Sequence, residues 1–227
     1  GDIELYNRLT QSMQGQERYV FNLAWAKGKN PMVVTNPLMF GTAQQITDRL
    51  FTAFEFDDPY YRAVQYSLIG VIVKLIKENP EHKGAVEGVV TFKRIYDLLT
   101  DETRLRDFVS KSRNDFDKRK VLDFLNDKRE ERLQKISGFL SQIEPFAIGE
   151  VSSVVNAEGT ESEFVSISRL VLAMPDNEDE RIPKYFQTET TIPKCYAFLL
   201  PTLLYQKISH QLGKLLLQEL GWAIGER

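Results

Sequence analysis

Apolar residues recur at helical spacing through the middle of the chain, whereas both ends carry short apolar runs of the kind found in strands. Between residues 42 and 143, successive windows place apolar side chains three or four positions apart, the period of one helix face. The segments 18–25, 31–37, 163–173 and 194–200 are shorter, and they are rich in β-branched and aromatic residues or alternate in polarity. The pattern predicts a helical middle between two α/β ends.

Boundary residues define the first helices of the middle block. Thr42 and Gln45 have the spacing of a capping box, which starts a helix with an apolar face of Ile46, Leu50, Ala53 and Phe54. Pro59 lies near the first turn of the next helix, where its missing N–H costs nothing. Asn79-Pro80 ends that helix, and shorter helices are expected over residues 91–99 and from Asp101 onward.

One long helix is predicted from Asn114 to Ile143, and one further helix is predicted near each end of the chain. The apolar seam of the long helix comprises Phe116, Leu122, Leu125, Leu133, Ile136, Leu140 and Ile143. A first helix is expected over 2–13 and a last one over 204–224. The last helix carries Leu204, Ile208, Leu212, Leu215, Leu216, Glu219 and Leu220 at helical steps.

The order of these elements suggests an insertion. A helix and two strands come first, about a hundred helical residues follow, and strands with a terminal helix close the chain. We therefore expect a mixed, predominantly α fold in which an all-helical domain (39–147) is inserted into an α/β domain. Residues 1–38 and 148–227 would form the two returning parts of that α/β domain.

Composition narrows the class of protein. The 227 residues carry a formal charge of −3, which argues against a chain that coats nucleic acid along its whole length. The one cysteine, Cys195, excludes an internal disulfide. The longest apolar stretch, residues 67–76, is about half of the ~20 residues that a membrane-spanning helix needs.

The sequence nominates no catalytic, cofactor-binding or metal-binding residue. A phosphate-binding loop needs glycines at a fixed spacing, as in GxxxxGK[ST], and no such loop occurs. The two histidines, His82 and His210, lie in unrelated contexts, and there is no CxxC pair. A cofactor or metal site in this chain is therefore not expected.

The strongest charge feature is the stretch 111–135, which holds nine Lys and Arg residues against six Asp and Glu residues. A basic helix face of this kind could contact DNA phosphates or a protein partner. The candidate contacts are Lys118, Arg119, Lys120, Lys128, Arg129 and Arg132. The alternative is a solvated helix whose interleaved acids form i,i+4 pairs such as Asp115–Arg119.

Several phrases resemble a known family. Asn36-Pro37-Leu38, then Asp48-Arg49-Leu50, then Asp58-Pro59-Tyr60-Tyr61-Arg62 are similar, in this order, to phrases of the type IV coupling proteins of conjugation and type IV secretion. Near the C-terminus, Leu212-Gly213-Lys214-Leu215 also resembles that family. Each phrase is short, but together they cover most of the chain in the family's order.

The resemblance implies a parent protein with membrane helices and a RecA-like ATPase domain that uses ATP and Mg²⁺. In that family an all-α domain is inserted into the ATPase domain, and hexamers at the inner membrane move DNA, a relaxase or other proteins into a secretion channel. This chain would be a cytoplasmic portion, and we expect it to be monomeric on its own. It would span the region between Walker A and Walker B and contain neither, so we expect no ATPase activity from it alone.

The same resemblance makes the segment 36–41 the passage from the ATPase core into the helical insertion, with Leu38 and Phe40 packed at the seam. Two alternatives stay open. The chain could be a stand-alone helical adaptor that never had an ATPase, or a piece of another RecA-like DNA translocase. An unrelated enzyme is a third, weaker reading.

Overall fold

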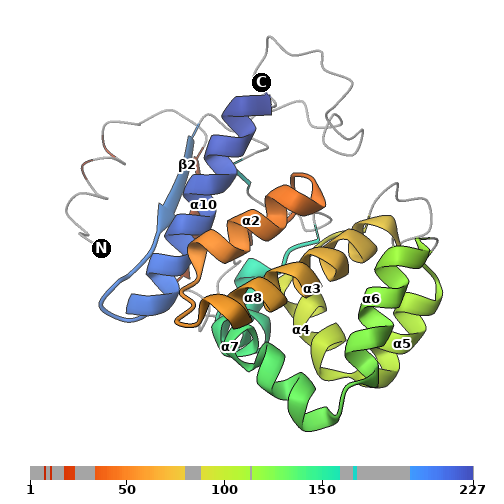
Figure 1. The fold of residues 1–227 in the computed structure, drawn as a ribbon. Helices are drawn as coiled ribbons and strands as arrows, with labels where there is room; N and C mark the ends of the chain where they lie inside the picture. Colours follow the sequence, from red (N-terminus) through yellow and green to blue (C-terminus); the bar gives the residue numbers. More distant parts are fainter. Residues whose placement is uncertain are drawn as a thin grey trace.

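The computed structural model describes residues 8, 11, 18–23, 34–79, 88–112, 114–158, 166–167 and 195–226. Within these ranges the fold is mostly helical, as predicted, and two short strands accompany the helices (Figure 1). The elements are β1 (Arg18–Asn22), α2 (Ala43–Ala53), α3 (Pro59–Glu78), α4 (Phe92–Thr100), α5 (Glu102–Ser110), α6 (Asp115–Asn126), α7 (Arg129–Ala147), α8 (Ser152–Val155), β2 (Cys195–Leu199) and α10 (Gln206–Glu226). The predicted helix over 2–13 and strand over 163–173 fall almost wholly outside the described residues.

A side-chain cap begins each helix from α2 to α6. Thr42 and Gln45 form the predicted capping box at α2. At α3, Asp58 accepts from two backbone N–H groups and Pro59 occupies the first turn. The caps of the next three helices are Thr91, Asp101 and Asn114. Because these residues satisfy N–H groups that a helix leaves unpaired, they fix where each helix starts.

Helix α3 is the centre of the helical block. It packs against α2, α4, α6 and α7, and its apolar side chains from Leu68 to Ile76 are largely buried. Phenylalanines extend this core: Phe51 of α2 stacks on Phe139 of α7 with ring centroids 5.5 Å apart. Phe92 of α4 stacks on Phe146 of α7 at 5.0 Å. The predicted apolar face of α2 is buried throughout.

The single long helix predicted over 114–143 is wrong, because the chain breaks between α6 and α7. Asp127 and Lys128 have extended backbone, with ψ of 154° and 147°. Two arginines satisfy the carbonyl oxygen of Leu125 near the end of α6: Arg106 at 3.2 Å and Arg132 at 2.6 Å. Two members of the predicted seam do not lie on a buried face, since Phe116 is 74% and Leu133 47% exposed.

The two strands are parallel neighbours, although the whole helical block lies between them in the sequence. Arg18 pairs with Cys195 and Asn22 with Leu199, and the rings of Phe21 and Phe198 lie 5.7 Å apart. The predicted strands over 18–25 and 194–200 are thus confirmed within the described residues. Helix α10 follows β2 and packs along α2, so that α2 lies between α10 and α3 (Figure 1).

One hydrophobic core joins these parts. Phe21 of β1 and Leu212 and Leu215 of α10 belong to the same buried cluster as the side chains of α2, α3 and α7. Leu38 is fully buried in this cluster, and Phe40 stacks on Trp222 of α10 with centroids 6.2 Å apart. Leu38 thus lies in the core that the helical block shares with α10, and Phe40 contacts α10 directly.

Candidate functional site

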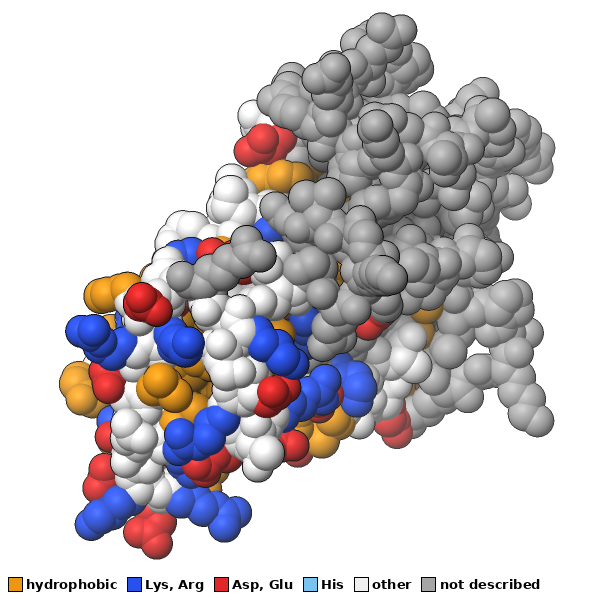
Figure 2. Space-filling model, turned by 90° about the vertical axis from the view of Figure 1, so that its right-hand side faces the viewer, with side chains coloured by type: hydrophobic (Ala, Val, Ile, Leu, Met, Phe, Trp, Pro, Cys, Tyr) orange, Lys and Arg blue, Asp and Glu red, His pale blue; other side chains and the backbone are white. Residues whose placement is uncertain are grey.

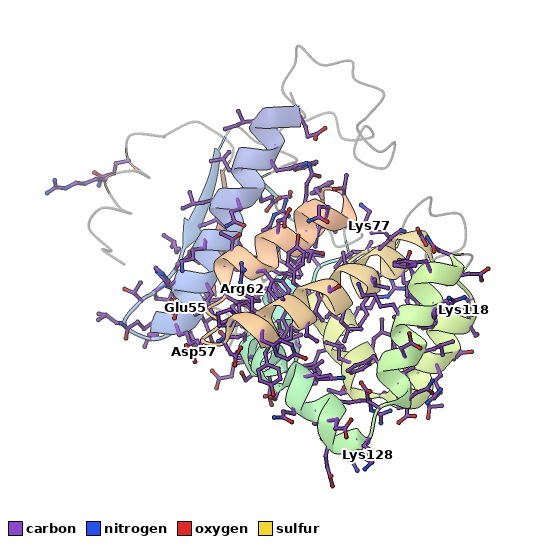
Figure 3. The ribbon with its side chains drawn as sticks, viewed as in Figure 1. Glu55, Asp57, Arg62, Lys77, Lys118 and Lys128 are labelled. Carbon is purple, nitrogen blue, oxygen red and sulfur yellow. The ribbon has the colours of Figure 1, made fainter. Side chains whose placement is uncertain are left out.

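The six basic residues nominated from the sequence lie around the break between α6 and α7. Lys118, Arg119 and Lys120 belong to α6. Lys128 precedes the first residue of α7 and makes no side-chain capping bond, and the other two lie in the first turns of α7. Lys118 lies in the first turn of α6, whereas Lys128 lies beyond the end of that helix, at the break. Figure 3 shows Lys118 and Lys128 well apart on the block, so the six do not form one continuous patch.

Two of the six are committed to holding helices together. Arg132 is 13% exposed and donates to the carbonyl oxygen of Leu125 and to Glu102 Oε2, both at 2.6 Å. Lys120 Nζ donates to the hydroxyl of Ser67 on α3. Arg119, Lys128 and Arg129 are exposed, and Lys118 is half-buried. These four are the candidates that a partner could reach.

Acidic side chains are interspersed with the basic ones on this side of the molecule (Figure 2). Lys111 pairs with Asp107 at 2.7 Å, and Lys135 pairs with Asp127 at 2.6 Å. Lys74 of α3 reaches the buried carboxylate of Asp117 at 2.6 Å, and that bond raises the pKa of Lys74. Asp115 and Arg119, both described, do not come within ion-pair distance of each other.

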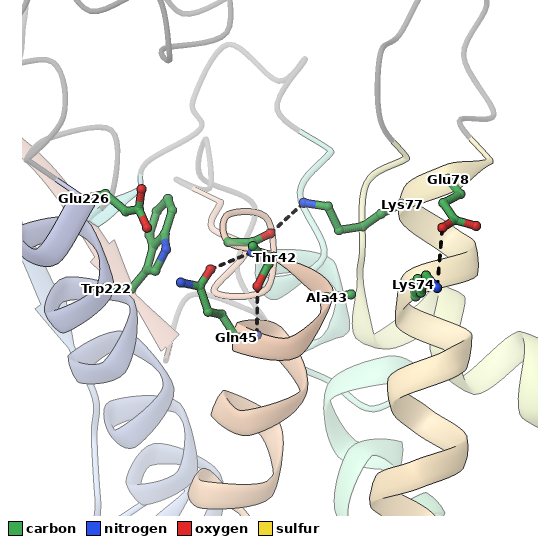
Figure 4. A pocket seen from close by; sticks show the side chains of 9 residues that line it. Thr42, Ala43, Gln45, Lys74, Lys77, Glu78, Trp222 and Glu226 are labelled. Carbon is green, nitrogen blue, oxygen red and sulfur yellow. Dashed lines mark hydrogen bonds and ion pairs between the residues drawn. The ribbon is translucent and has the colours of Figure 1, made fainter. Parts of the chain in front are cut away.

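A shallow cleft of about 400 Å³ lies where α2, α3 and α10 meet (Figure 4). Its polar groups are largely engaged with one another. Lys77 Nζ donates to the carbonyl oxygen of Gly41 at 2.6 Å. Thr42 N–H donates to Gln45 Oε1 at 2.7 Å, so the N-terminus of α2 is already capped. Trp222 and Glu226 of α10 form the opposite wall, and the lining lysines and glutamates balance in charge.

Beside the cleft, the side chain of Asn36 ties together the points where the chain joins and leaves the helical block. Its Nδ2 donates to the carbonyl oxygens of Val90 and Ala157, each at 2.9 Å, and its Oδ1 accepts from Leu38 N–H at 2.9 Å. The backbone of Thr35 also pairs with Val154 and Ala157, at 2.8 and 3.2 Å. The side chain of Asn36 is fully buried and makes three hydrogen bonds.

A second buried polar group, Arg49 of α2, is only 3% exposed. Its guanidinium donates to the carbonyl oxygens of Pro37 and Phe40, the latter at 3.2 Å. Burial lowers the pKa of Arg49, and the negative charge of Glu219 on α10 partly restores it. Glu219 is fully buried and accepts from the hydroxyl of Ser166 at 2.8 Å.

Arg49 and Glu219 were not nominated from the sequence, although a signal for each was present. Arg49 follows Ile46 by three positions and precedes Leu50, so it stands on the apolar face of α2. Glu219 stands among the leucines of the last helix at their own spacing. A charged residue on an apolar face indicates a buried partner, because an unpaired buried charge is very costly.

Metal chemistry finds no support among the described residues, since no group of three His, Cys, Asp or Glu side chains there could hold an ion. His210 is exposed, and His82 lies outside the described ranges.

Within the described ranges, no helix is long and apolar enough to cross a membrane. Comparisons of this chain with protein-family models, with curated proteins and with solved structures give no match. The family resemblance therefore stays a proposal.

Proposed function

We propose that this chain is part of a DNA- or protein-translocating coupling ATPase of conjugation or type IV secretion, and that its helical block recognises the cargo. The observation that carries the proposal is the path of the chain. It leaves β1, runs through the helical block, and returns to β2 as the parallel neighbour of β1. The two passages at Thr35 and at Val154–Ala157 lie side by side.

This path supports an insertion because parallel strands always need a crossover, and here the crossover contains the block. Parallel strands also rarely occur outside larger sheets whose faces are both covered. Within the described residues only β1 and β2 pair. A pair of parallel strands is more easily understood as part of a larger α/β domain than as the edge of a stand-alone helical adaptor.

In this proposal the parent is a RecA-like motor, hexameric and anchored at the inner membrane, that binds ATP and Mg²⁺ through residues outside these 227. The sequence contains no Walker A loop, so we assign no ATP-binding residue to this chain. What the chain contributes is a helical block that shares one hydrophobic core with α10. A relaxase, another protein substrate or DNA is the cargo that such a block would meet.

Substituting the accessible cations of α6 tests whether the helical block binds DNA. If Lys118 and Arg119 contact phosphates, the chain should bind short fluorescent DNA with an affinity that falls as salt rises. Lys118→Ala/Arg119→Ala should weaken that binding for every sequence, and should reduce the slope of log K against log salt by about 2.

A matched control removes two cations elsewhere. Lys93 on α4 and Lys207 on α10 are both exposed, so Lys93→Ala/Lys207→Ala changes the net charge equally and leaves α6 intact. The control should bind as the wild type does. Equal losses in both double variants, or binding that is indifferent to salt, would rule out a DNA contact at α6. A pull-down with relaxase would then test the protein arm.

A further inference from the structure

Three segments that lie far apart in the sequence meet at the side chain of Asn36. They are the entry segment, through which the chain enters the helical block (34–40), the segment that leads into α4 (89–93), and the exit segment, through which the chain leaves the block (154–157). Asn36 belongs to the entry segment, and its Nδ2 donates to Val90 of the second segment and to Ala157 of the third. Both N–H groups of this buried amide are therefore used, one toward each neighbouring segment.

Backbone hydrogen bonds join the entry and exit segments as well. Thr35 N–H donates to the carbonyl oxygen of Val154 at 2.8 Å, and Ala157 N–H donates to the carbonyl oxygen of Thr35 at 3.2 Å. Leu38 N–H donates to Asn36 Oδ1, which fixes the amide in the orientation that its two donors need. The two passages of the chain are thus paired directly and not only through the core.

The third connection comes from Asn156 in the exit segment. Its Oδ1 accepts from Lys93 N–H at 3.0 Å, and its Nδ2 donates to the carbonyl oxygen of Phe146 in α7 at 2.8 Å. Lys93 lies in the first turn of α4, whose N–H groups have no partner within the helix. Thr91 caps Arg94 of that turn, and Asn156 supplies the partner for Lys93. Each of the three segments is therefore bonded to the other two.

The same segments share a small hydrophobic cluster, distinct from the main core. Met39 of the entry segment and Ala157 of the exit segment are its buried members, and Val34, Phe40 and Val89 pack against them. A unit with its own hydrogen bonds and its own apolar contacts is of the kind that opens cooperatively, at a free energy below that of global unfolding.

We propose that the three segments form a latch, defined as residues 34–40, 89–93 and 154–157, that opens and closes as one unit. Its hydrogen bonds form a closed triangle, so moving one segment away leaves polar groups of the other two without their partners. An unpaired buried polar group is costly, and the cost makes partial opening unfavourable. The helical block is then joined to the strand pair through one all-or-none connection instead of two independent linkers. The inference holds whether or not the block recognises a cargo.

Native-state hydrogen exchange of the full chain, followed by NMR at several low denaturant concentrations, tests the latch. The reporters are four amides whose partners all lie within it: Thr35, Leu38, Lys93 and Ala157. Amides released by the same opening have the same opening free energy and the same dependence on denaturant. The latch predicts that the protection factors of the four agree within about twofold at each concentration, and that all four exchange faster than the slowest amides of α3.

Two outcomes of this measurement would overturn the latch. Four unrelated denaturant dependences would mean that the contacts open independently. Exchange of the four amides only together with the slowest amides of α3 would mean that they report global unfolding.

Asn156→Ala sharpens the test, because it removes the acceptor of Lys93 N–H and leaves the partners of Thr35 and Leu38 in place. If one opening releases all of them, all three amides should accelerate by the same factor, about tenfold for the lost hydrogen bonds. Asn126→Ala, at an exposed position that ends α6, is the control and should leave the three rates unchanged.

Acceleration of Lys93 alone in Asn156→Ala would show independent contacts, and equal acceleration throughout α6 would show a loss of global stability. Either result would overturn the latch. If Asn156→Ala does not fold, the denaturant series on the unaltered chain decides by itself.

Discussion

The joint around residues 36–41, where the chain enters the helical block, and the surface around α6 and α7 use polar residues in opposite ways. At the joint, Asn36 and Arg49 are buried and each donates to two backbone carbonyl oxygens. Around α6 and α7 the cations are numerous, and two of them, Lys120 and Arg132, bond to neighbouring helices. The uncharged segment 36–41 therefore makes the more specific polar contacts, whereas the charge-rich stretch 111–135 lies largely at the surface.

The largest effect is expected at Asn36. Asn36→Ala removes three buried hydrogen bonds and leaves the carbonyl groups of Val90 and Ala157 without that donor. Each unsatisfied buried group costs about 1–3 kcal/mol, so the free energy of unfolding should fall by about 3 kcal/mol. Denaturant unfolding measures this loss. Asn126→Ala, at an exposed position that ends α6, should stay within about 0.5 kcal/mol of the wild type.

A smaller loss is expected at Gly41, where the turn requires a positive φ of 106°. In Gly41→Ala the new Cβ would lie 3.2 Å from Gln45 Oε1, against the capping box. The strained backbone should cost about 1–3 kcal/mol. Gly225→Ala offers a control of opposite sign: it lies within α10 with open space around it, so alanine there should raise stability by about 0.5 kcal/mol. Thermal unfolding that ranks the two variants otherwise would contradict this reading of the turn.

Alanine variants of Arg132 and Arg129 compare a cation that joins helices with one that is exposed to solvent. Arg132→Ala removes two hydrogen bonds that join α5, α6 and α7, and should lower stability by about 1 kcal/mol. Arg129→Ala, at an exposed position three residues earlier, should be neutral within about 0.5 kcal/mol. If both variants unfold at the wild-type midpoint, the break between α6 and α7 is held by other contacts.

The smallest effect is a pH dependence at Glu102. Hydrogen bonds from Arg132 and then Arg106 hold the pKa of Glu102 below its ordinary value. A lowered carboxyl pKa contributes stability above the unfolded-state pKa, and this contribution is lost as pH falls through the folded-state pKa. Glu102→Gln should therefore lower the melting temperature slightly at neutral pH, and the difference should vanish in acid. In an Arg132→Ala background the same substitution should show a weaker pH dependence.

Helix positions could largely be predicted from the sequence, because capping residues and apolar spacing are local signals. Thr42, Pro59 and Asp101 placed their helices correctly. The break at Asp127 was missed for a physical reason. Leu133 follows Leu125 by eight positions, which equals two steps of four residues, and this spacing also fits one continuous helix. The contacts of Arg106 and Arg132 with Leu125 help to stabilise the break, and both depend on the tertiary fold.

The candidate site was less predictable. Counting charges identified the stretch 111–135, but no count could tell that Arg132 and Lys120 face inward while Arg129 faces solvent. The parallel pairing of β1 with β2 and the hydrogen bond from Asn36 to Ala157 join residues more than a hundred positions apart. Such contacts depend on how the elements pack, which spacing within one element does not encode.

The proposal that this helical block belongs to an ATP-driven coupling motor is tested most directly by reading the gene on both sides of the segment. The account predicts, in the same reading frame, a Walker A loop shortly before residue 1 and an apolar strand ending in Asp-Glu soon after residue 227. A continuous frame that contains neither motif would contradict the motor, and the helical adaptor would become the leading explanation.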